Sequence, residues 1–314
     1  MRAAAVALVV ACCAGAVADA AAAAFPGANG SIAFVRPGRG VWTVHPDGSG
    51  LTSVSGERPG AGCDTDPSFS PSGLMLTFQT CDPKHHVTVV GTMTVTGSKR
   101  RIVVPTSAKA PSPQTPAFSP SGKRLVFAAG TSTPQLFVIG ADGRHRRRLE
   151  ATGYSPSWSS AGMVYTVPLN RRRWCNSTEL DDLYKMGRKL RHKHRLTRTN
   201  GSYGPDWSPD ARRIAFTRDF SVGGDNPKRV PSMDCKPVVR AASGYGPEIV
   251  VADAEGKNAR RLTHAGGSDP SWSPDAKLIA FERSGWIWTM TAEGLGAHRL
   301  VRGGQPAWQP LPAP

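Results

Sequence analysis

The chain has 314 residues and a formal net charge of +16, with 39 Lys and Arg residues against 23 Asp and Glu residues. Its 34 glycines and 27 prolines, and the near absence of long runs of helix-forming residues, exclude a mostly helical protein and favour strands and turns. A protein this basic is attracted over long distances to anionic polymers and surfaces.

The first 24 residues have the pattern of a secretory signal peptide. Arg2 precedes an apolar run from Ala3 to Val17, which leads into small residues that offer Ala-x-Ala cleavage sites. The run is shorter than the roughly 18 residues of a membrane-spanning helix. We therefore expect residues 1–24 to be removed and residues 25–314 to form one exported domain without a transmembrane segment. In an alternative reading, cleavage before Cys12 leaves a lipid anchor on that residue.

One motif then occurs six times along the chain. Four complete copies read x-Pro-x-Phe/Trp-Ser-Pro-Ser/Asp-Gly/Ala, one copy is degenerate and one is cut off by the chain end; they begin at Asp66, Thr115, Ser155, Gly204, Asp269 and Gln305. Ser-Pro-Asp/Ser-Gly favours a type I turn with Pro at its second position. Each complete copy is followed by a short apolar run that ends in Phe, so the motif predicts a β-hairpin.

Two more strands complete each unit. The third strand is expected at residues 41–45, 87–96, 136–139, 183–186, 248–252 and 286–290, and a fourth around Leu149, Leu196, Leu262 or Leu300. Four strands make one propeller blade. Residues 29–34 form a second strand without a first, and residues 305–308 can supply it and cover both edges. The sequence thus predicts an all-β propeller of six four-stranded antiparallel blades, closed by the C-terminal strand joining the N-terminal blade.

The repeated D-P-x-W-S-P-D-G-x-x-I-A-F pattern resembles that of the TolB-like, WD-repeat-like propellers of bacterial envelopes. The resemblance covers residues 28–310 and implies a six-bladed propeller. TolB carries an additional N-terminal α/β domain, and some relatives carry a C-terminal peptidase domain, for which this chain has no room. Neither membership of a Tol machine nor peptidase activity is therefore carried over, because a fold does not fix a function.

Basic residues gather at the turns between the third and fourth strands. We expect a basic face formed by Arg100, Arg101, Arg146, Arg147, Arg148, Arg191, Lys193, Arg260 and Arg261. Such a face would attract an anionic envelope polymer. The alternative is a solvated rim, since an Arg before the leucine of the last strand is common in the family that the chain resembles. No aromatic residues alternate with these cations, so no specific nucleic acid is expected.

Long insertions and all the cysteines beyond the signal peptide map to the opposite face. The insertions are residues 168–182 and 219–247, and the cysteines are Cys63, Cys81, Cys175 and Cys235. An even number of cysteines in an exported chain indicates two disulfides out of three possible pairings. Proximity on the blades favours Cys63 with Cys81 and Cys175 with Cys235.

The residue before the proline of each first strand should line the mouth of the central channel on the insertion-bearing face. These residues are Asp66, Thr115, Ser155, Gly204, Asp269 and Gln305. We expect this ring to bind a ligand or a peptide. The alternative is structural, because Asp before Pro can accept backbone hydrogen bonds and hold the turn.

The chain contains no Gly-x-Ser-x-Gly, His-Glu-x-x-His or phosphate-binding Gly-Lys-Ser/Thr motif. Adjacent His85 and His86 would point to opposite sides of a strand, and His192 and His194 lie among cations, so no metal or cofactor is expected. We expect a monomeric, exported binding module for a protein or an anionic envelope polymer, without catalytic residues. The alternatives are a polysaccharide lyase or hydrolase with a channel-mouth site, and a passive structural protein of the envelope.

Overall fold

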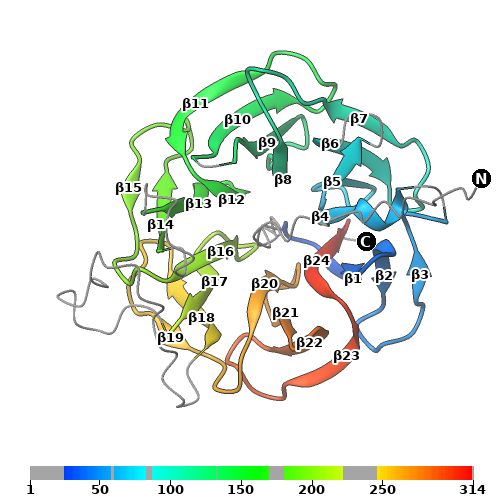
Figure 1. Cartoon of the computed structure of the whole chain (residues 1–314). Coiled ribbons are helices and arrows are strands. Elements are labelled where there is room, and N and C mark those ends of the chain that lie inside the picture. Colours follow the sequence, from blue (N-terminus) through cyan, green and yellow to red (C-terminus); the bar gives the residue numbers. More distant parts are fainter. Residues whose placement is uncertain are drawn as a thin grey trace, which may run out of the picture.

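Six four-stranded antiparallel sheets surround a central channel (Figure 1). The computed structural model describes residues 25–57, 60–82, 87–131, 133–169, 180–221 and 246–312. Within this part of the chain the regular structure is all strand apart from one short 3₁₀ turn, Ala61–Cys63. No helix in these ranges is long and apolar enough to cross a membrane. The predicted six-bladed propeller is confirmed.

In the first three blades the strands run outward from the channel in chain order, except that the innermost strand of blade 1 is the last strand of the chain. Blade 1 consists of β24 (Gly304–Leu311), β1 (Ala28–Arg36), β2 (Gly40–Val44) and β3 (Thr52–Ser53). Blade 2 consists of β4 (Thr65–Phe69), β5 (Met75–Asp82), β6 (Val87–Thr94) and β7 (Arg101–Val104). Blade 3 consists of β8 (Pro113–Phe118), β9 (Arg124–Ala129), β10 (Gln135–Gly140) and β11 (Arg147–Thr152).

The remaining three blades repeat this order. Blade 4 consists of β12 (Tyr154–Ser159), β13 (Gly162–Pro168), β14 (Asp181–Met186) and β15 (His194–Arg195). Blade 5 consists of β16 (Ser202–Trp207), β17 (Arg213–Asp219), β18 (Pro247–Asp253) and β19 (Arg260–Arg261). Blade 6 consists of β20 (Ser268–Trp272), β21 (Leu278–Arg283), β22 (Trp286–Thr291) and β23 (His298–Arg302).

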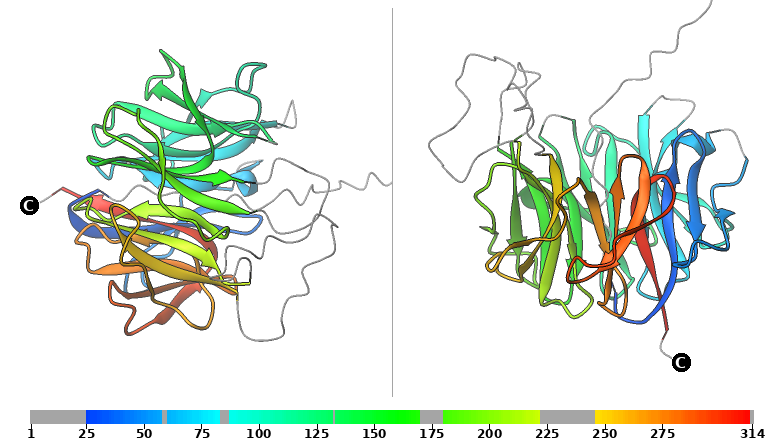
Figure 2. Two further views of the ribbon diagram at one scale, coloured as in Figure 1. Left: turned by 90° about the vertical axis from the view of Figure 1, so that its left-hand side faces the viewer. Right: turned by 90° about the horizontal axis from the view of Figure 1, so that it is seen from below.

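The last strand of the chain closes the ring, as predicted. Strand β24 pairs with β1 in antiparallel register, with Trp308 opposite Ile32 and Ala307 opposite Ala33. Seen from the side, β24 ends on the face that carries the turns between first and second strands (Figure 2). Because the two ends of the chain share one sheet, β24 covers the edge that β1 would otherwise leave open and becomes the innermost strand of blade 1.

The outermost strands of blades 4 and 5 are shorter than the sequence predicts. Strands β15 and β19 end before Leu196 and Leu262, which lie just beyond them. Here a threonine hydroxyl replaces a backbone carbonyl of the fourth strand as the hydrogen-bond acceptor. The Leu183 and Ile249 N–H groups donate to Thr197 Oγ1 and Thr263 Oγ1, both at 2.9 Å. A buried N–H of the third strand is thereby satisfied without a longer outer strand.

The repeated turn forms at the predicted place and is closed by a hydrogen bond between its fourth and first residues. The Gly73 N–H donates to the Ser70 carbonyl at 2.9 Å, and Ala211 makes the same bond to Ser208 at 2.8 Å. The fourth turn residue is left-handed, with φ of 68° at Gly73 and 56° at Ala211. Glycine adopts this conformation without strain, which explains its place in the motif.

The motif aromatics pack between blades, as expected for core residues. Trp207 and Trp272 are fully buried, and Trp158 is 4% exposed. Cations of the preceding blade cover two of these rings, with the Arg124 guanidinium 5.3 Å from the Trp158 centroid and that of Arg213 4.5 Å from Trp272. Such contacts add to the area that the indoles bury. These tryptophans therefore join the blades.

Candidate functional site at the channel

The six predicted channel residues occupy one structural position, repeated in every blade. Their φ angles lie between 46° and 56°, in the left-handed region, although only one of them is glycine. In each blade the register between first and second strands shifts at this point. The side chains are almost fully buried: Thr115 and Ser155 are 0% exposed, Asp66 and Asp269 3%, and Gln305 8%. The ring is a β-bulge repeated six times.

Three ring side chains accept the backbone N–H of the next blade's ring residue. Gln305 Oε1 accepts from the Asp66 N–H at 3.1 Å, and Thr115 Oγ1 accepts from the Ser155 N–H at 3.2 Å. Between them, the Asp66 carboxyl accepts from the Thr115 N–H. These bonds link blades 1 to 4 in order. Like the structural alternative described above, they are side-chain acceptors of backbone N–H groups, but they join neighbouring blades instead of holding the turn of one blade.

The second strand completes the circle in the other three blades. Thr166 Oγ1 accepts the Gly204 N–H and Thr217 Oγ1 accepts the Asp269 N–H, both at 3.1 Å. Glu282 accepts the Gln305 N–H. Sequence reasoning missed these three acceptors. Their signal is positional, because each follows the aromatic residue that ends the second-strand motif.

In each blade the acceptor is either the ring residue or the second-strand residue that follows the aromatic, and the residue types at these two positions help to explain which one acts. Gly204 has no side chain, so Thr217 of the same blade must supply the acceptor for the next one. In blades 1 and 3 the residue after the aromatic is Val35 or Ala128, which cannot accept, and the ring residue does so instead. In blade 2 the acceptor is Asp66, and the buried Oε1 of Gln79 has no hydrogen-bond partner in the described part of the chain.

Carboxyl groups gather around this circle. Burial, reinforced by the charge of Asp269, raises the pKa of Asp66 to about 8. Burial also raises the pKa of Glu282, although the hydrogen bond from the Gln305 N–H opposes the change. Asp66 is thus largely protonated at neutral pH. A neutral carboxyl can donate a hydrogen bond as well as accept one.

The predicted basic residues lie in or beside the outermost strands, around the circumference of the disc (Figure 1). Two of them form ion pairs with buried carboxylates: Arg100 lies 2.7 Å from Asp64 and Arg261 2.7 Å from Glu248. The other seven are exposed: Arg101, Arg146, Arg147, Arg148, Arg191, Lys193 and Arg260. Several reach a neighbouring blade, as Arg260 does in donating to the Glu293 carbonyl at 2.8 Å.

The sequence analysis also missed the acidic residues that form ion pairs with arginines of the outermost strands. Asp182 with Arg195 and Glu248 with Arg261 are each separated by 13 residues, and each arginine precedes Leu-Thr. The threonine hydroxyl donates to the same carboxylate, at 2.7 Å from Thr197 to Asp182. This repeated spacing is the signal that could have revealed the pairs.

One predicted disulfide is present. Cys63 and Cys81 are bonded, with their Cα atoms 5.5 Å apart. Cys12, Cys175, Cys235, His85, His86 and most of both insertions lie outside the described residues, as do residues 1–24. Within the described ranges no group of three or more His, Cys, Asp or Glu side chains is arranged to hold a metal ion.

Comparison with known proteins supports the fold. No family model matches the chain. TolB from Acinetobacter baumannii superposes with a TM-score of 0.66 at 17% identity, over 90% of this chain and 67% of that one. A TolB-type protein from Agrobacterium tumefaciens gives 0.60 at 18% identity, over 91% of this chain and 93% of its own. An oligogalacturonate lyase in complex with manganese gives 0.50 at 11% identity, over 84% and 70%. The chain thus has the fold of TolB-type six-bladed propellers.

Proposed function

We propose that this protein is an exported, non-catalytic binding module that recognises a protein or an envelope polymer through the channel ring on its insertion-bearing face. The observation that carries the proposal is the set of five non-glycine residues held in the left-handed conformation around the channel. Each costs about 1 to 3 kcal/mol. Ten other non-glycine residues of the described ranges share this conformation, so it is the placement of the five around the channel that distinguishes the ring. The circle of hydrogen bonds fixes these residues on a rigid frame before any partner arrives.

Two further features fit a partner that offers hydrogen-bond donors. Gln79 stands in blade 2 where Thr166 and Thr217 stand in blades 4 and 5, and its buried Oε1 has no partner among the described residues. A donor that reached it would remove the cost of an unsatisfied buried acceptor. The Asp66 carboxyl, which is largely neutral at pH 7, can also take part in hydrogen bonds at the ring. The channel therefore favours an amide-bearing segment, which offers N–H donors without needing a charge.

Export rests on the signal-peptide pattern of residues 1–24 and on the Cys63–Cys81 disulfide. Disulfides persist in oxidising compartments outside the cytoplasm. The fold shared with TolB-type proteins fits the same compartment. A lipid at Cys12 is the alternative form of the mature chain, and intact-mass measurement of the protein from its native envelope distinguishes the two.

The test is capture from envelope extract by residues 25–314, at about 0.05 M and about 0.5 M salt, with bound species identified by mass spectrometry. The ring variant is Asp66→Asn with Asp269→Asn, and the matched control is Arg147→Gln with Arg260→Gln. We expect one partner to persist at high salt, to be lost with the ring variant and to be kept by the control. Partners that bind only at low salt and depend on the control arginines would overturn the proposal in favour of the basic rim.

A second candidate follows from the fold shared with an oligogalacturonate lyase. In it the same channel mouth would act on a polysaccharide as a lyase or a hydrolase. Incubation with acidic and neutral oligosaccharides, followed by chromatography of the products, tests it. Shortened products that disappear with the ring variant would replace the binding role, and intact substrates would exclude the enzyme on those sugars.

A further inference from the structure

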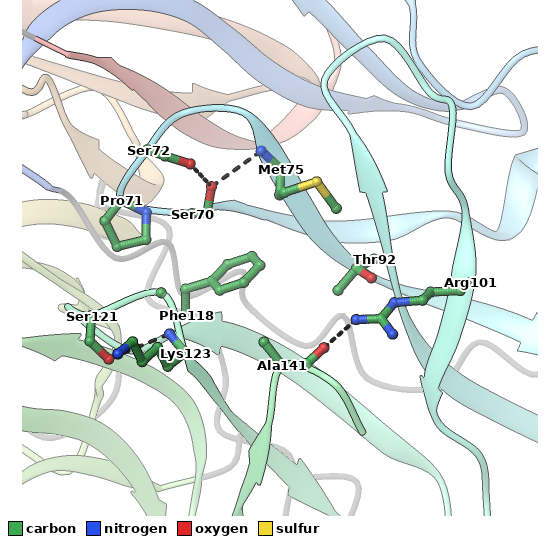
Figure 3. A pocket seen from close by; sticks show the side chains of 11 residues that line it. Ser70, Pro71, Ser72, Met75, Thr92, Arg101, Phe118, Ser121, Lys123 and Ala141 are labelled. Carbon is green, nitrogen blue, oxygen red and sulfur yellow. Dashed lines mark hydrogen bonds between the residues drawn. The ribbon is translucent and has the colours of Figure 1, made fainter. Parts of the chain in front are cut away.

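A groove of about 540 Å³ lies between blades 2 and 3, at the far end of their first strands from the channel ring (Figure 3). The turn after β4 and the turn after β8 form two of its walls, and Arg101 of β7 and Ala141 form another. Its volume lies within the range of small-molecule sites, about 300 to 1,000 Å³.

Two cations stand at this groove and no acidic residue lines it. Arg101 and Lys123 are both exposed. The Arg101 guanidinium spans the blades and donates to the Ala141 carbonyl at 2.5 Å. A guanidinium has five N–H donors in a planar fork, so it keeps donors for a carboxylate or a similar anion. The charge of the groove thus selects an anionic ligand.

A buried hydroxyl gives an independent sign of a ligand. Thr92 lines the groove, is only 3% exposed, and its Oγ1 has no hydrogen-bond partner among the described residues. It is the direct cross-strand neighbour of Arg101, so the two side chains lie on one face of the sheet. Figure 3 shows both side chains at the same end of the groove. A buried polar group without a partner is unusual and destabilises the protein unless a ligand supplies the missing hydrogen bond.

The remaining walls suit a hydroxylated ring. Ser70, Ser72 and Ser121 supply hydroxyl groups from the two turns, and Met75 and Phe118 supply apolar surface. Serine hydroxyls can donate hydrogen bonds to sugar hydroxyls and accept them. The C–H face of a pyranose can pack on apolar side chains. An inorganic anion alone would leave the apolar walls without contacts.

We propose that this groove is a binding site for an acidic sugar unit, with the carboxylate held by Arg101 and Lys123 and a ring hydroxyl hydrogen-bonded to Thr92. The site lies away from the channel ring and is independent of the function proposed for it. A free sugar acid and a residue within an acidic polysaccharide present the same chemistry. Monomer and oligomer probes separate these two sources.

Titration calorimetry of residues 25–314 tests the proposal with D-glucuronate and a glucuronate-containing oligosaccharide as ligands, and with D-glucose, acetate and inorganic phosphate as comparisons. We expect glucuronate to bind at least about tenfold more tightly than glucose, which lacks the carboxylate, and than acetate, which lacks the ring. A tenfold difference corresponds to about 1.4 kcal/mol. Equal binding of phosphate would show a generic anion site and overturn the sugar assignment.

Thr92→Val is the decisive variant because it preserves shape and removes only the hydroxyl. Since that hydroxyl has no protein partner, the variant should fold with unchanged or higher stability, yet bind glucuronate about three- to tenfold more weakly. Thr77→Val is the matched control, because Thr77 is opposite Thr92 in the sheet but its Oγ1 donates to the Gly91 carbonyl at 3.0 Å. The control should lose stability and keep its affinity. Unchanged affinity in Thr92→Val would overturn the role of Thr92.

Arg101→Gln with Lys123→Gln should abolish measurable binding, whereas Arg147→Gln, at an exposed arginine of β11, should have no effect. If the double variant and Arg147→Gln weaken binding to the same extent, the ligand is attracted by the general positive field of the protein, and the groove is not the site. If the oligosaccharide binds and the monomer does not, the ligand is a polymer residue that also needs contacts beyond the groove.

Discussion

Gln305 and Asp66, which are 239 residues apart in the sequence, are joined by two hydrogen bonds. Gln305 Nε2 donates to Asp66 Oδ1 at 3.0 Å, and the Asp66 N–H donates to Gln305 Oε1 at 3.1 Å. Gln305 lies in the C-terminal strand that closes blade 1, and Asp66 lies in the first strand of blade 2. Closure of the propeller is therefore coupled directly to the channel ring.

Gln305→Ala should destabilise the protein by about 1 to 3 kcal/mol, because it leaves the buried Asp66 N–H without an acceptor. Equilibrium unfolding in urea measures the change. Gln114→Ala is the control, since the half-buried Gln114 amide donates only to the Gly130 carbonyl at the blade edge, and it should cost less than about 1 kcal/mol. Equal losses in the two variants would contradict a special role for the closing pair.

Asp66→Asn should change how stability depends on pH. The pKa of Asp66 is about 8 in the folded protein against 3.8 for the ordinary group, so the folded state keeps a proton that the unfolded chain releases. The free energy of unfolding must then fall as pH rises from about 4 to about 8, and no further above that. An asparagine cannot ionise, so relative to wild type the variant should gain about 2 to 5 kcal/mol across this window.

Urea unfolding of both proteins at about pH 4, 6 and 8 provides the comparison, with all values taken at one ionic strength. The quantity of interest is the difference between the two proteins at each pH, because other groups titrate in both. Two parallel pH profiles would show that the pKa of Asp66 is not raised and would contradict the burial of its carboxyl group from water.

Gly73→Ala should cost far more than Gly122→Ala. Both glycines have left-handed φ, 68° and 69°, so both changes carry the backbone penalty of about 1 kcal/mol. A Cβ at Gly73 would lie 1.8 Å from the Pro310 carbonyl oxygen, whereas the nearest atom to a Cβ at Gly122 is Pro71 Cδ at 3.5 Å. Thermal unfolding should therefore show a much larger fall for Gly73→Ala, and similar falls would contradict the contact between the blade 2 turn and the closing strand.

The Cys63–Cys81 disulfide should contribute roughly 3 kcal/mol, the chain-entropy value for a loop whose ends are 18 residues apart. It also supports an ion pair, because Asp64 follows Cys63 and Thr80 precedes Cys81, and Arg100 donates to both of these neighbours, at 2.7 Å and 3.2 Å. Unfolding of the Cys63→Ser, Cys81→Ser double variant measures the contribution. A variant as stable as wild type would show that the ion pair alone holds this connection.

The sequence was sufficient for the fold because the motif repeats. Six copies of one hairpin, a turn with fixed chemistry and an unpaired strand at each end determine the number of blades and the closure. Asp66, Thr115 and Gln305, which the motif aligns, share one backbone conformation, and their role in binding stays a prediction. Sequence reasoning did not identify their partners, because hydrogen bonds between blades join residues from different repeats, as Asp269 and Thr217 show.

The sequence alone does not show which basic residues are exposed and which form buried ion pairs. Arg100 and Arg101 are adjacent in the sequence, yet Arg100 is half-buried against Asp64 while Arg101 is exposed and lines the groove between blades 2 and 3. In blade 2, therefore, the two neighbouring cations do not form one surface, whereas Arg146, Arg147 and Arg148 are all exposed. The separate roles of Arg100 and Arg101 follow from the register of the outer strand.

Site-specific photo-crosslinking to a partner captured from envelope extract tests the central claim most directly. One pair of probes replaces Thr65 and Ser268, each of which directly precedes a ring residue, and the other pair replaces the exposed Arg147 and Arg260. We predict crosslinks from Thr65 and Ser268 and none from the two rim positions. Crosslinks from the rim alone would contradict recognition at the channel ring and assign binding to the basic circumference.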